Sequence, residues 1–305
     1  MTPRERLAAA VDGSQVDRVP YCAWHHFRLD PPAGPLSDMA AAELRFYESF
    51  EPDLLKVMHD IDYEETWELV EPSDWRRIPV LDPESGNFGL QLHTLRQIRE
   101  ALDPSVPIID TVFGVYHYAN ELSRGRVLSH LREDPEAVHV GLAALTQSLI
   151  HYARATISAG CEGIYYALSG ASADAATRRE YCGSFKDYDR EILQSVAGAQ
   201  FNILHLHGYH DLYFDLTHDL PASVVCWSDR AGGPSLVEAR GMHRGCLMGG
   251  IDEKHFELMT PEQIIAQARS AIADAGDRRF ILSPGCSVPN DASVTRLRAI
   301  RDAVL

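Results

Sequence analysis

The sequence predicts an α/β fold, and more specifically a single-domain (β/α)8 TIM-type barrel over residues 1–305. The chain has 305 residues, which suits one large barrel or two ordinary domains. Eight short apolar runs alternate with longer amphipathic stretches, and most runs are apolar on both faces, as buried parallel strands require. A doubly wound sheet is the main alternative, but it needs a switch point and usually has fewer strands. No composition break marks a second domain.

The predicted elements follow in order along the chain. Thr2-Pro3-Arg4-Glu5 predicts a helix start, with Thr2 as the N-cap and Pro3 at the first helical position. The predicted strands are the eight apolar runs at residues 19–24, 54–58, 106–113, 163–168, 201–205, 224–227, 246–250 and 280–283. Further helices are predicted over residues 135–159, 187–199 and 261–276. Residues 62–102 are rich in Pro, Trp and charge, which predicts an excursion or small hairpin over the barrel mouth.

Composition excludes several classes of protein. The net charge of −16 disfavours nucleic acid and anionic membrane surfaces as partners, because both require basic patches. No apolar run is long enough to span a bilayer, and the N-terminus lacks the apolar core of a signal peptide. The six cysteines have no paired spacing, which is typical of free thiols in a reducing compartment. We therefore expect a cytoplasmic protein.

The most informative stretch is His205-Leu206-His207-Gly208, at the end of the fifth predicted strand. Side chains two residues apart on a strand point to the same side, so both imidazoles would face one way. Cys286 follows the last predicted strand in Ser283-Pro284-Gly285-Cys286. If both strand ends face one mouth, two nitrogens and a thiolate converge there. Three such ligands would leave one zinc position open for chemistry.

Other polar residues follow further predicted strands, where barrel enzymes carry their active sites. We predict catalytic roles for His25, His26 and Asp60. We predict substrate contacts for Arg28, His59, Tyr63, Tyr116, Trp227 and Asp252. Structural explanations compete with these roles: a strand-end aspartate could cap a helix, and a tryptophan, a cysteine or His59 could belong to the packed core.

The motifs that contain these residues resemble the uroporphyrinogen decarboxylase superfamily. The resemblance runs nearly end to end and rests on Arg4-Glu5-Arg6-Leu7, Val16-Asp17-Arg18-Val19-Pro20, Pro52-Asp53-Leu54-Leu55-Lys56-Val57, the segment 201–208, Gly249-Gly250-Ile251-Asp252 and the segment 280–286. It implies a (β/α)8 barrel, in agreement with the strand count.

Two chemistries occur in that superfamily. The true decarboxylases use no cofactor and hold substrate carboxylates with two arginines after the first strand, whereas Ala23-Trp24-His25-His26-Phe27-Arg28 lacks the first arginine here. Asp60 matches their catalytic aspartate, but Cys286 stands where they have a histidine. The corrinoid-linked methyltransferases bind zinc through His-x-Cys after the fifth strand and Cys after the eighth, which resembles His205-x-His207 and Cys286. The resemblance is therefore closer to the methyltransferase branch.

This resemblance implies a zinc-dependent methyltransferase or demethylase that moves a methyl group between a small substrate and a corrinoid. The corrinoid (cobalamin) would come on a separate protein or as the free cofactor, and a homodimer is a further expectation. The first alternative is a metal-free decarboxylase or lyase acting on a small carboxylic acid, with uroporphyrinogen itself disfavoured. The second is a non-catalytic barrel that binds a ligand or docks a corrinoid protein.

Overall fold

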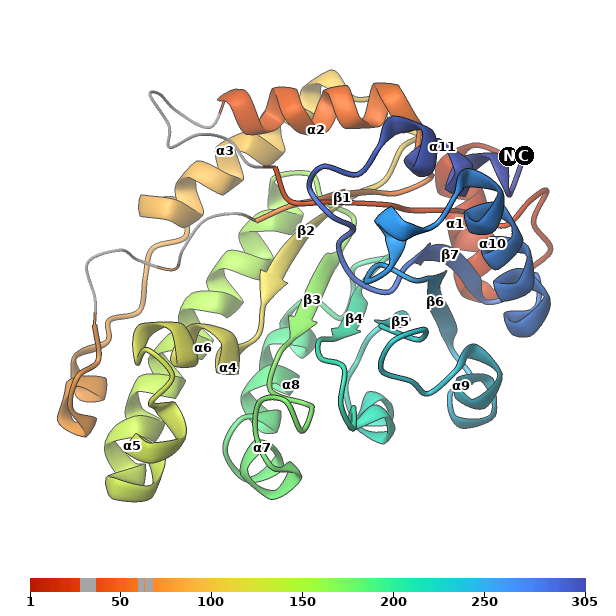
Figure 1. Cartoon of the computed structure of the whole chain (residues 1–305). Coiled ribbons are helices and arrows are strands. Elements are labelled where there is room, and N and C mark those ends of the chain that lie inside the picture. Colours follow the sequence, from red (N-terminus) through yellow and green to blue (C-terminus); the bar gives the residue numbers. More distant parts are fainter. Residues whose placement is uncertain (28–36, 60–62, 64–67) are drawn as a thin grey trace.

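A computed structural model of the chain describes residues 1–27, 37–59, 63 and 68–305 (Figure 1). Its centre is a curled sheet of parallel strands, with helices on the outer side. The described residues form seven strands, which lie in the sheet in chain order. They are β1 (Leu55–Val57), β2 (Ile108–Phe113), β3 (Ile164–Leu168), β4 (Ile203–Leu206), β5 (Val224–Trp227), β6 (Cys246–Ile251) and β7 (Phe280–Pro284).

The predicted first strand, residues 19–24, is not a regular strand, so the expected eight strands are corrected to seven. Its backbone nevertheless lies beside β7: Cys22 N donates to Leu282 O at 2.9 Å, and Leu282 N donates to Pro20 O at 2.9 Å. On the β1 side, Asp53 N donates to Tyr21 O at 2.9 Å. Pro20 has no N–H to donate, which interrupts a regular ladder. The α/β class with parallel strands is confirmed, and the sheet is consistent with a TIM-like barrel.

Helices connect the strands along the outside of the sheet (Figure 1). They are α1 (Pro3–Asp12), α2 (Ser37–Phe50), α3 (Gly86–Ala101), α4 (Val115–Leu122), α5 (Val127–Glu133), α6 (Pro135–Ser158), α7 (Arg178–Ser184), α8 (Lys186–Ser195), α9 (Leu236–Met242), α10 (Pro261–Ala275) and α11 (Val294–Asp302). Short 3-10 turns are η1 (Pro72–Arg77), η2 (Phe214–His218) and η3 (Phe256–Leu258).

The helix starts predicted from capping residues are confirmed. Thr2 caps α1 and Thr260 caps α10, each in a reciprocal capping box. The helix predicted at 187–199 ends earlier, at Ser195, and Gly198 disfavours its continuation. Within residues 62–102, the described part contains η1 and α3, and α3 packs against α2 and α6.

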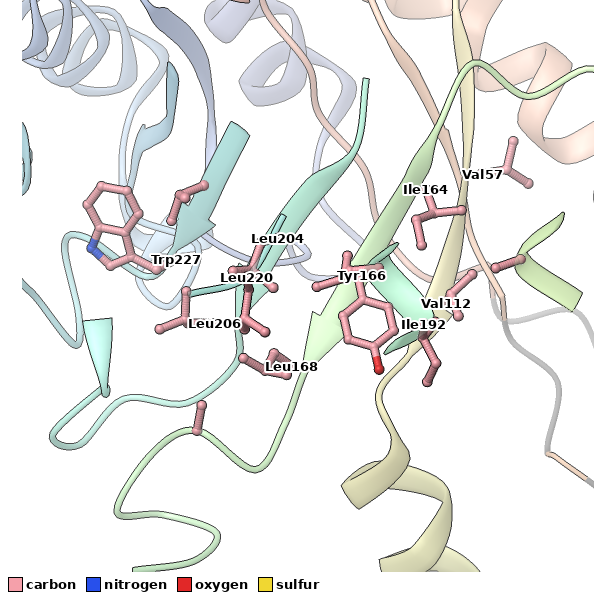
Figure 2. Close-up of a cluster of buried hydrophobic side chains, with 14 of the residues drawn as sticks. Val57, Val112, Ile164, Tyr166, Leu168, Ile192, Leu204, Leu206, Leu220 and Trp227 are labelled. Atoms are coloured by element: carbon pink, nitrogen blue, oxygen red, sulfur yellow. The ribbon is translucent and has the colours of Figure 1, made fainter. Parts of the chain in front are cut away.

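Alternating side chains divide the core into an outer and an inner part. Figure 2 shows the outer part, where Ile164, Tyr166, Leu204 and Leu206 of β3 and β4 point toward the covering helices. The inner part lies inside the curled sheet and includes Tyr165, Ile203, Val224, Cys226, Cys246, Met248 and Ile281. Because strand side chains alternate with a period of two, the inner face of β4 carries Ile203 and His205. This alternation decides which polar side chains enter the barrel.

Among the described residues, no helix is long and apolar enough to cross a membrane.

Candidate functional site

His205 and Cys286 form the centre of the site. His205 projects from β4 into the barrel interior with 2% of its surface exposed, and its ring stacks on Tyr165 with centroids 5.1 Å apart. Neither ring nitrogen of His205 has a hydrogen-bond partner within the described part of the chain. The Cys286 thiol, just beyond β7, lies near enough to interact with the imidazole, although the two make no hydrogen bond of good geometry. The structure thus brings together two of the three predicted ligands.

The environment favours the metal-binding forms of both groups. Burial lowers the pKa of His205, which keeps the imidazole neutral with a free lone pair. Burial alone would raise the pKa of the Cys286 thiol, but the neighbouring His205 outweighs it and brings the pKa below its ordinary value. Metals bind neutral imidazole and thiolate, so the pair is poised for ligation.

His207 lies at the mouth rather than inside the barrel. Its side chain is exposed, and its ring stands edge-on to His205 with centroids 5.8 Å apart. The turn after it depends on Gly208, because its φ of 137° disfavours any side chain and a Cβ there would lie only 2.5 Å from Ser172 Oγ. His207 lines a pocket of about 310 Å³ with Tyr116, Asn120, Ser169, Ser172, Asp174, Ala175, Gly208 and Tyr209. It therefore faces a space that suits a small substrate.

Glu253 is a site residue that sequence reasoning missed. It follows β6, has 3% of its surface exposed, and accepts a hydrogen bond from Ser228 Oγ at 2.5 Å. Its second oxygen is buried without a partner among the described residues, and burial raises its pKa. Gly285 lets the Cys286 loop approach, because a Cβ there would lie 2.9 Å from Glu253 Oε2. The sequence did give one indication of Glu253: it is a carboxylate directly after the family motif Gly249-Gly250-Ile251-Asp252.

Lys56 is a second missed residue. It lies on β1 inside the barrel, buried, and donates to Thr111 Oγ1 at 2.9 Å. Its ammonium sits 4.5 Å from the centre of the Tyr165 ring that stacks on His205. This positive charge adds to the lowering of the His205 pKa. A lysine inside the apolar run 54–58 was the sequence indication of a buried charge.

The residues after the first predicted strand lie elsewhere. His25 and His26 line a separate pocket of about 430 Å³ beside α2 and α11, and none of its described lining residues lines the His207 pocket. His25 Nδ1 bonds to the His26 carbonyl at 2.9 Å. Arg28 and Asp60 fall outside the described residues. The structure therefore does not bring His25 and His26 together with His205.

The other predicted substrate contacts divide into one pocket residue and four with structural surroundings. Tyr116 lines the His207 pocket and donates to Ala175 O at 2.8 Å. Trp227 faces the outer core and packs on Phe214. His59 is hydrogen-bonded to Tyr152, and Tyr63 packs on Phe88 and Tyr118. Asp252 accepts a hydrogen bond from the backbone N–H of His255.

His205 and Cys286 have donor atoms of the types that bind a metal ion, but the described side chains do not form a complete metal site. Among the described residues, no three His, Cys, Asp or Glu side chains lie close enough together to hold a metal. The buried, unpartnered nitrogens of His205 are nevertheless costly in a protein interior unless a ligand satisfies them. Nitrogen beside sulfur is a donor set that zinc prefers.

Comparison with known proteins identifies the family. The profile of the family described as uroporphyrinogen decarboxylase (URO-D) matches residues 64–305. The chain belongs to the URO-D family. Its relatives include a methylated-thiol–coenzyme M methyltransferase from Methanosarcina mazei, 23% identical, covering 98% of this chain and 88% of the relative. A uroporphyrinogen decarboxylase from Proteus mirabilis is 30% identical, but covers only 30% of this chain and 27% of that enzyme.

Solved structures share the fold of this chain. A methyltransferase from Methanosarcina mazei has a TM-score of 0.84 at 20% identity, with 99% of this chain and 98% of that one covered. A B12-independent methionine synthase from a Shewanella species has a TM-score of 0.54 at 12% identity, covering 70% of this chain and 64% of that one. The predicted superfamily is confirmed. The predicted leaning toward its methyltransferases is confirmed too, because that match spans nearly the whole URO-D-family chain.

Proposed function

We propose that this URO-D-family protein is a zinc-dependent enzyme that transfers a methyl group between a small substrate and a corrinoid. The methyltransferase relative that covers nearly the whole chain supports methyl transfer. The observation that carries the zinc assignment is the pair of buried, unpartnered His205 nitrogens beside Cys286. The proposal also places residues 19–24 as the irregular eighth member of a closed (β/α)8 barrel.

In this proposal His205 and Cys286 would hold the zinc ion, and His207 is the third ligand that the sequence predicts. When bound, zinc would lower the pKa of a substrate thiol or hydroxyl, so that the deprotonated form is available near neutral pH. The substrate would occupy the 310 Å³ pocket beside His207. The buried walls around His205 exclude water from the reacting atoms.

Glu253 is our proposed proton acceptor. Its unpartnered oxygen faces Gly285, the residue before Cys286, and burial raises the pKa of the carboxyl, which favours uptake of a proton. In the methylation direction Glu253 takes the proton that the acceptor thiol or hydroxyl loses. In the demethylation direction the methyl group would pass to the corrinoid as its bond to the heteroatom breaks, and Glu253 would return a proton to the released heteroatom. Asp60 remains proposed for orienting the substrate or relaying protons, whereas His25 and His26, which line a separate pocket, could do so only for a ligand that reaches that pocket.

We further propose that the corrinoid comes on a separate protein or as the free cofactor. The strands among the described residues form one sheet, and helices cover its outer side. A methylated thiol is the first donor to test, because the relative that covers most of the chain is named for that class. Transfer would be followed by the change in corrinoid absorbance as reduced cobalamin becomes methylated.

The decisive measurement is the zinc content of the untagged, full-length protein together with this transfer assay. We expect close to one zinc per chain, loss of most of it in His205→Ala, and loss of transfer with it. His151→Ala, an exposed histidine on α6, is the control and should keep both. Less than roughly a fifth of a zinc ion per chain, unchanged in His205→Ala, would contradict the proposal.

A metal-free decarboxylase or lyase acting on a small carboxylic acid is the second candidate, and the local 30% identity to a decarboxylase favours it. It predicts full turnover of a carboxylic acid in the presence of a strong chelator, whereas the zinc proposal predicts loss of transfer. A non-catalytic barrel predicts ligand binding without turnover, unaffected by Cys286→Ser.

A further inference from the structure

Cys226 is the register partner of His205. In the parallel pairing of β4 with β5, Leu204 stands opposite Val225 and His205 opposite Cys226. Partners in register point to the same face of a sheet. Cys226 lies in the inner part of the core, the side to which His205 also projects, and is fully buried. The thiol and the imidazole therefore enter the barrel side by side.

The contacts of Cys226 connect it to both established members of the site. Its Sγ lies 3.5 Å from the carbonyl oxygen of Gly285, the residue before Cys286. The Tyr165 hydroxyl donates to the same Sγ at 3.5 Å, and the Tyr165 ring stacks on His205. Cys226 thus contacts the loop that carries Cys286 and the hydroxyl of Tyr165, whose ring packs on His205.

His207 is less well placed than Cys226 to bind a metal ion together with His205 and Cys286. It lies beyond the end of β4, is exposed, and lines the mouth pocket. A zinc ion bound to His205 and Cys286 would have to be drawn outward to meet His207, whereas Cys226 lies at the same depth as His205. Both unsatisfied nitrogens of His205 are buried at that depth.

We propose, on the basis of the zinc-dependent function above, that Cys226 is the third protein ligand, together with His205 and Cys286. His207 is then a residue of the substrate pocket. One nitrogen and two sulfurs leave the fourth tetrahedral position open for the substrate, on the side of the mouth. For these three side chains to hold zinc, the two thiols would have to approach the imidazole, because no three such side chains among the described residues lie close enough together to hold a metal. Two thiolates also neutralise the 2+ charge of the ion, which one thiolate and two imidazoles would not.

The test is X-ray absorption at the zinc edge on the untagged, full-length zinc protein, which counts sulfur and nitrogen ligands without any activity assay. We expect two sulfurs at about 2.3 Å and one protein nitrogen at about 2.0–2.1 Å. Cys226→Ala should lose one sulfur and bind zinc at least about tenfold more weakly in competition with a chelator. His207→Ala should keep both sulfurs and bind zinc as tightly as the parent protein.

Cys246→Ala is the matched control, because Cys246 is also fully buried on the inner face, on the neighbouring strand β6. Cys226→Ser, which changes only sulfur to oxygen, serves as the second variant if alanine impairs folding. One sulfur in the parent protein, or two sulfurs retained in either Cys226 variant, overturns the inference while leaving the zinc function intact. A parent protein that binds no zinc overturns both.

Discussion

Glu253 is the side chain whose chemistry depends most on its surroundings. Its neighbour Asp252 is tied to His255 as a local cap. Glu253 is instead turned into the protein, where one oxygen accepts from Ser228 and the other has no partner among the described residues. Burial disfavours the charged form and raises the pKa of the carboxyl. Asp252 and Glu253 are adjacent in the sequence, but they have different surroundings and therefore different hydrogen bonding, which the amino-acid composition alone does not predict.

Glu253→Gln should remove the acid limb of the pH–rate profile. As a proton acceptor Glu253 must be ionised, so kcat/KM of the parent enzyme should fall as pH drops through the raised pKa. We expect the glutamine variant to be slower by about 10²–10⁴-fold and to lack that limb. Asp252→Asn is the control and should keep it. A limb that persists in Glu253→Gln, with zinc content unchanged, would show that another group accepts the proton.

The start of the chain shows how a family motif can serve the fold instead of the site. Asp53, fully buried ahead of β1, pairs with Arg6 of α1 at 2.5 Å and with Arg18 at 2.6 Å. It also accepts from Tyr21 N at 3.0 Å. This network joins the first helix and the segment 19–24 to the sheet. The motifs around Arg6, Arg18 and Asp53 are thus explained by an internal ion network.

Asp53→Ala should destabilise the protein by about 3 kcal/mol, because it removes the buried carboxylate that Arg6 and Arg18 share, while Arg6 keeps its pair with Asp17. Urea unfolding followed by circular dichroism measures the change. Glu84→Ala removes the exposed pair of Glu84 with Arg96 and should cost at most about 1 kcal/mol. Equal costs for the two variants would mean that the Asp53 network contributes no more than a surface pair.

The closure of the sheet depends on hydrogen bonds that no regular strand provides. Residues 20–22 bond to β7 on one side and to the residues before β1 on the other. This segment therefore helps to fix the position of β7, which leads into Cys286, relative to β1. The first and last strands of the curled sheet are therefore linked by an irregular stretch.

Native-state hydrogen exchange should show the amides of Cys22 and Leu282 protected as strongly as those between β6 and β7. Their partners at 2.9 Å are buried in the sheet, so exchange requires its opening. The Ser85 amide, bonded to Asp82 in an exposed turn, is the fast-exchanging reference. Exchange of the Cys22 amide as fast as that of Ser85 would mean that the barrel is open between β7 and β1.

The pattern of apolar runs was enough to predict the α/β class, seven strands close to their observed positions and the capped starts of α1 and α10. These features follow from short-range physics: the period of side-chain alternation and the needs of helix ends. The same reasoning overestimated residues 19–24, because apolar character does not reveal which backbone groups find ladder partners. The same reasoning predicted that His205 and Cys286 meet at the ends of β4 and β7, and the structure does bring these two side chains together.

A spacing of two positions between histidines on a strand predicts that the side chains share a face, but not that both are buried inside the curled sheet. The strand β4 ends at Leu206, so His205 is buried while His207 turns outward to the pocket. Cys226 and Glu253, 21 and 48 positions away from His205, approach the site only because strand register and the Gly285 loop bring them there. Local sequence therefore determined most of the strands and the strand ends that carry His205 and Cys286, whereas the other side chains beside these two depend on pairing between distant segments, which only the folded chain establishes.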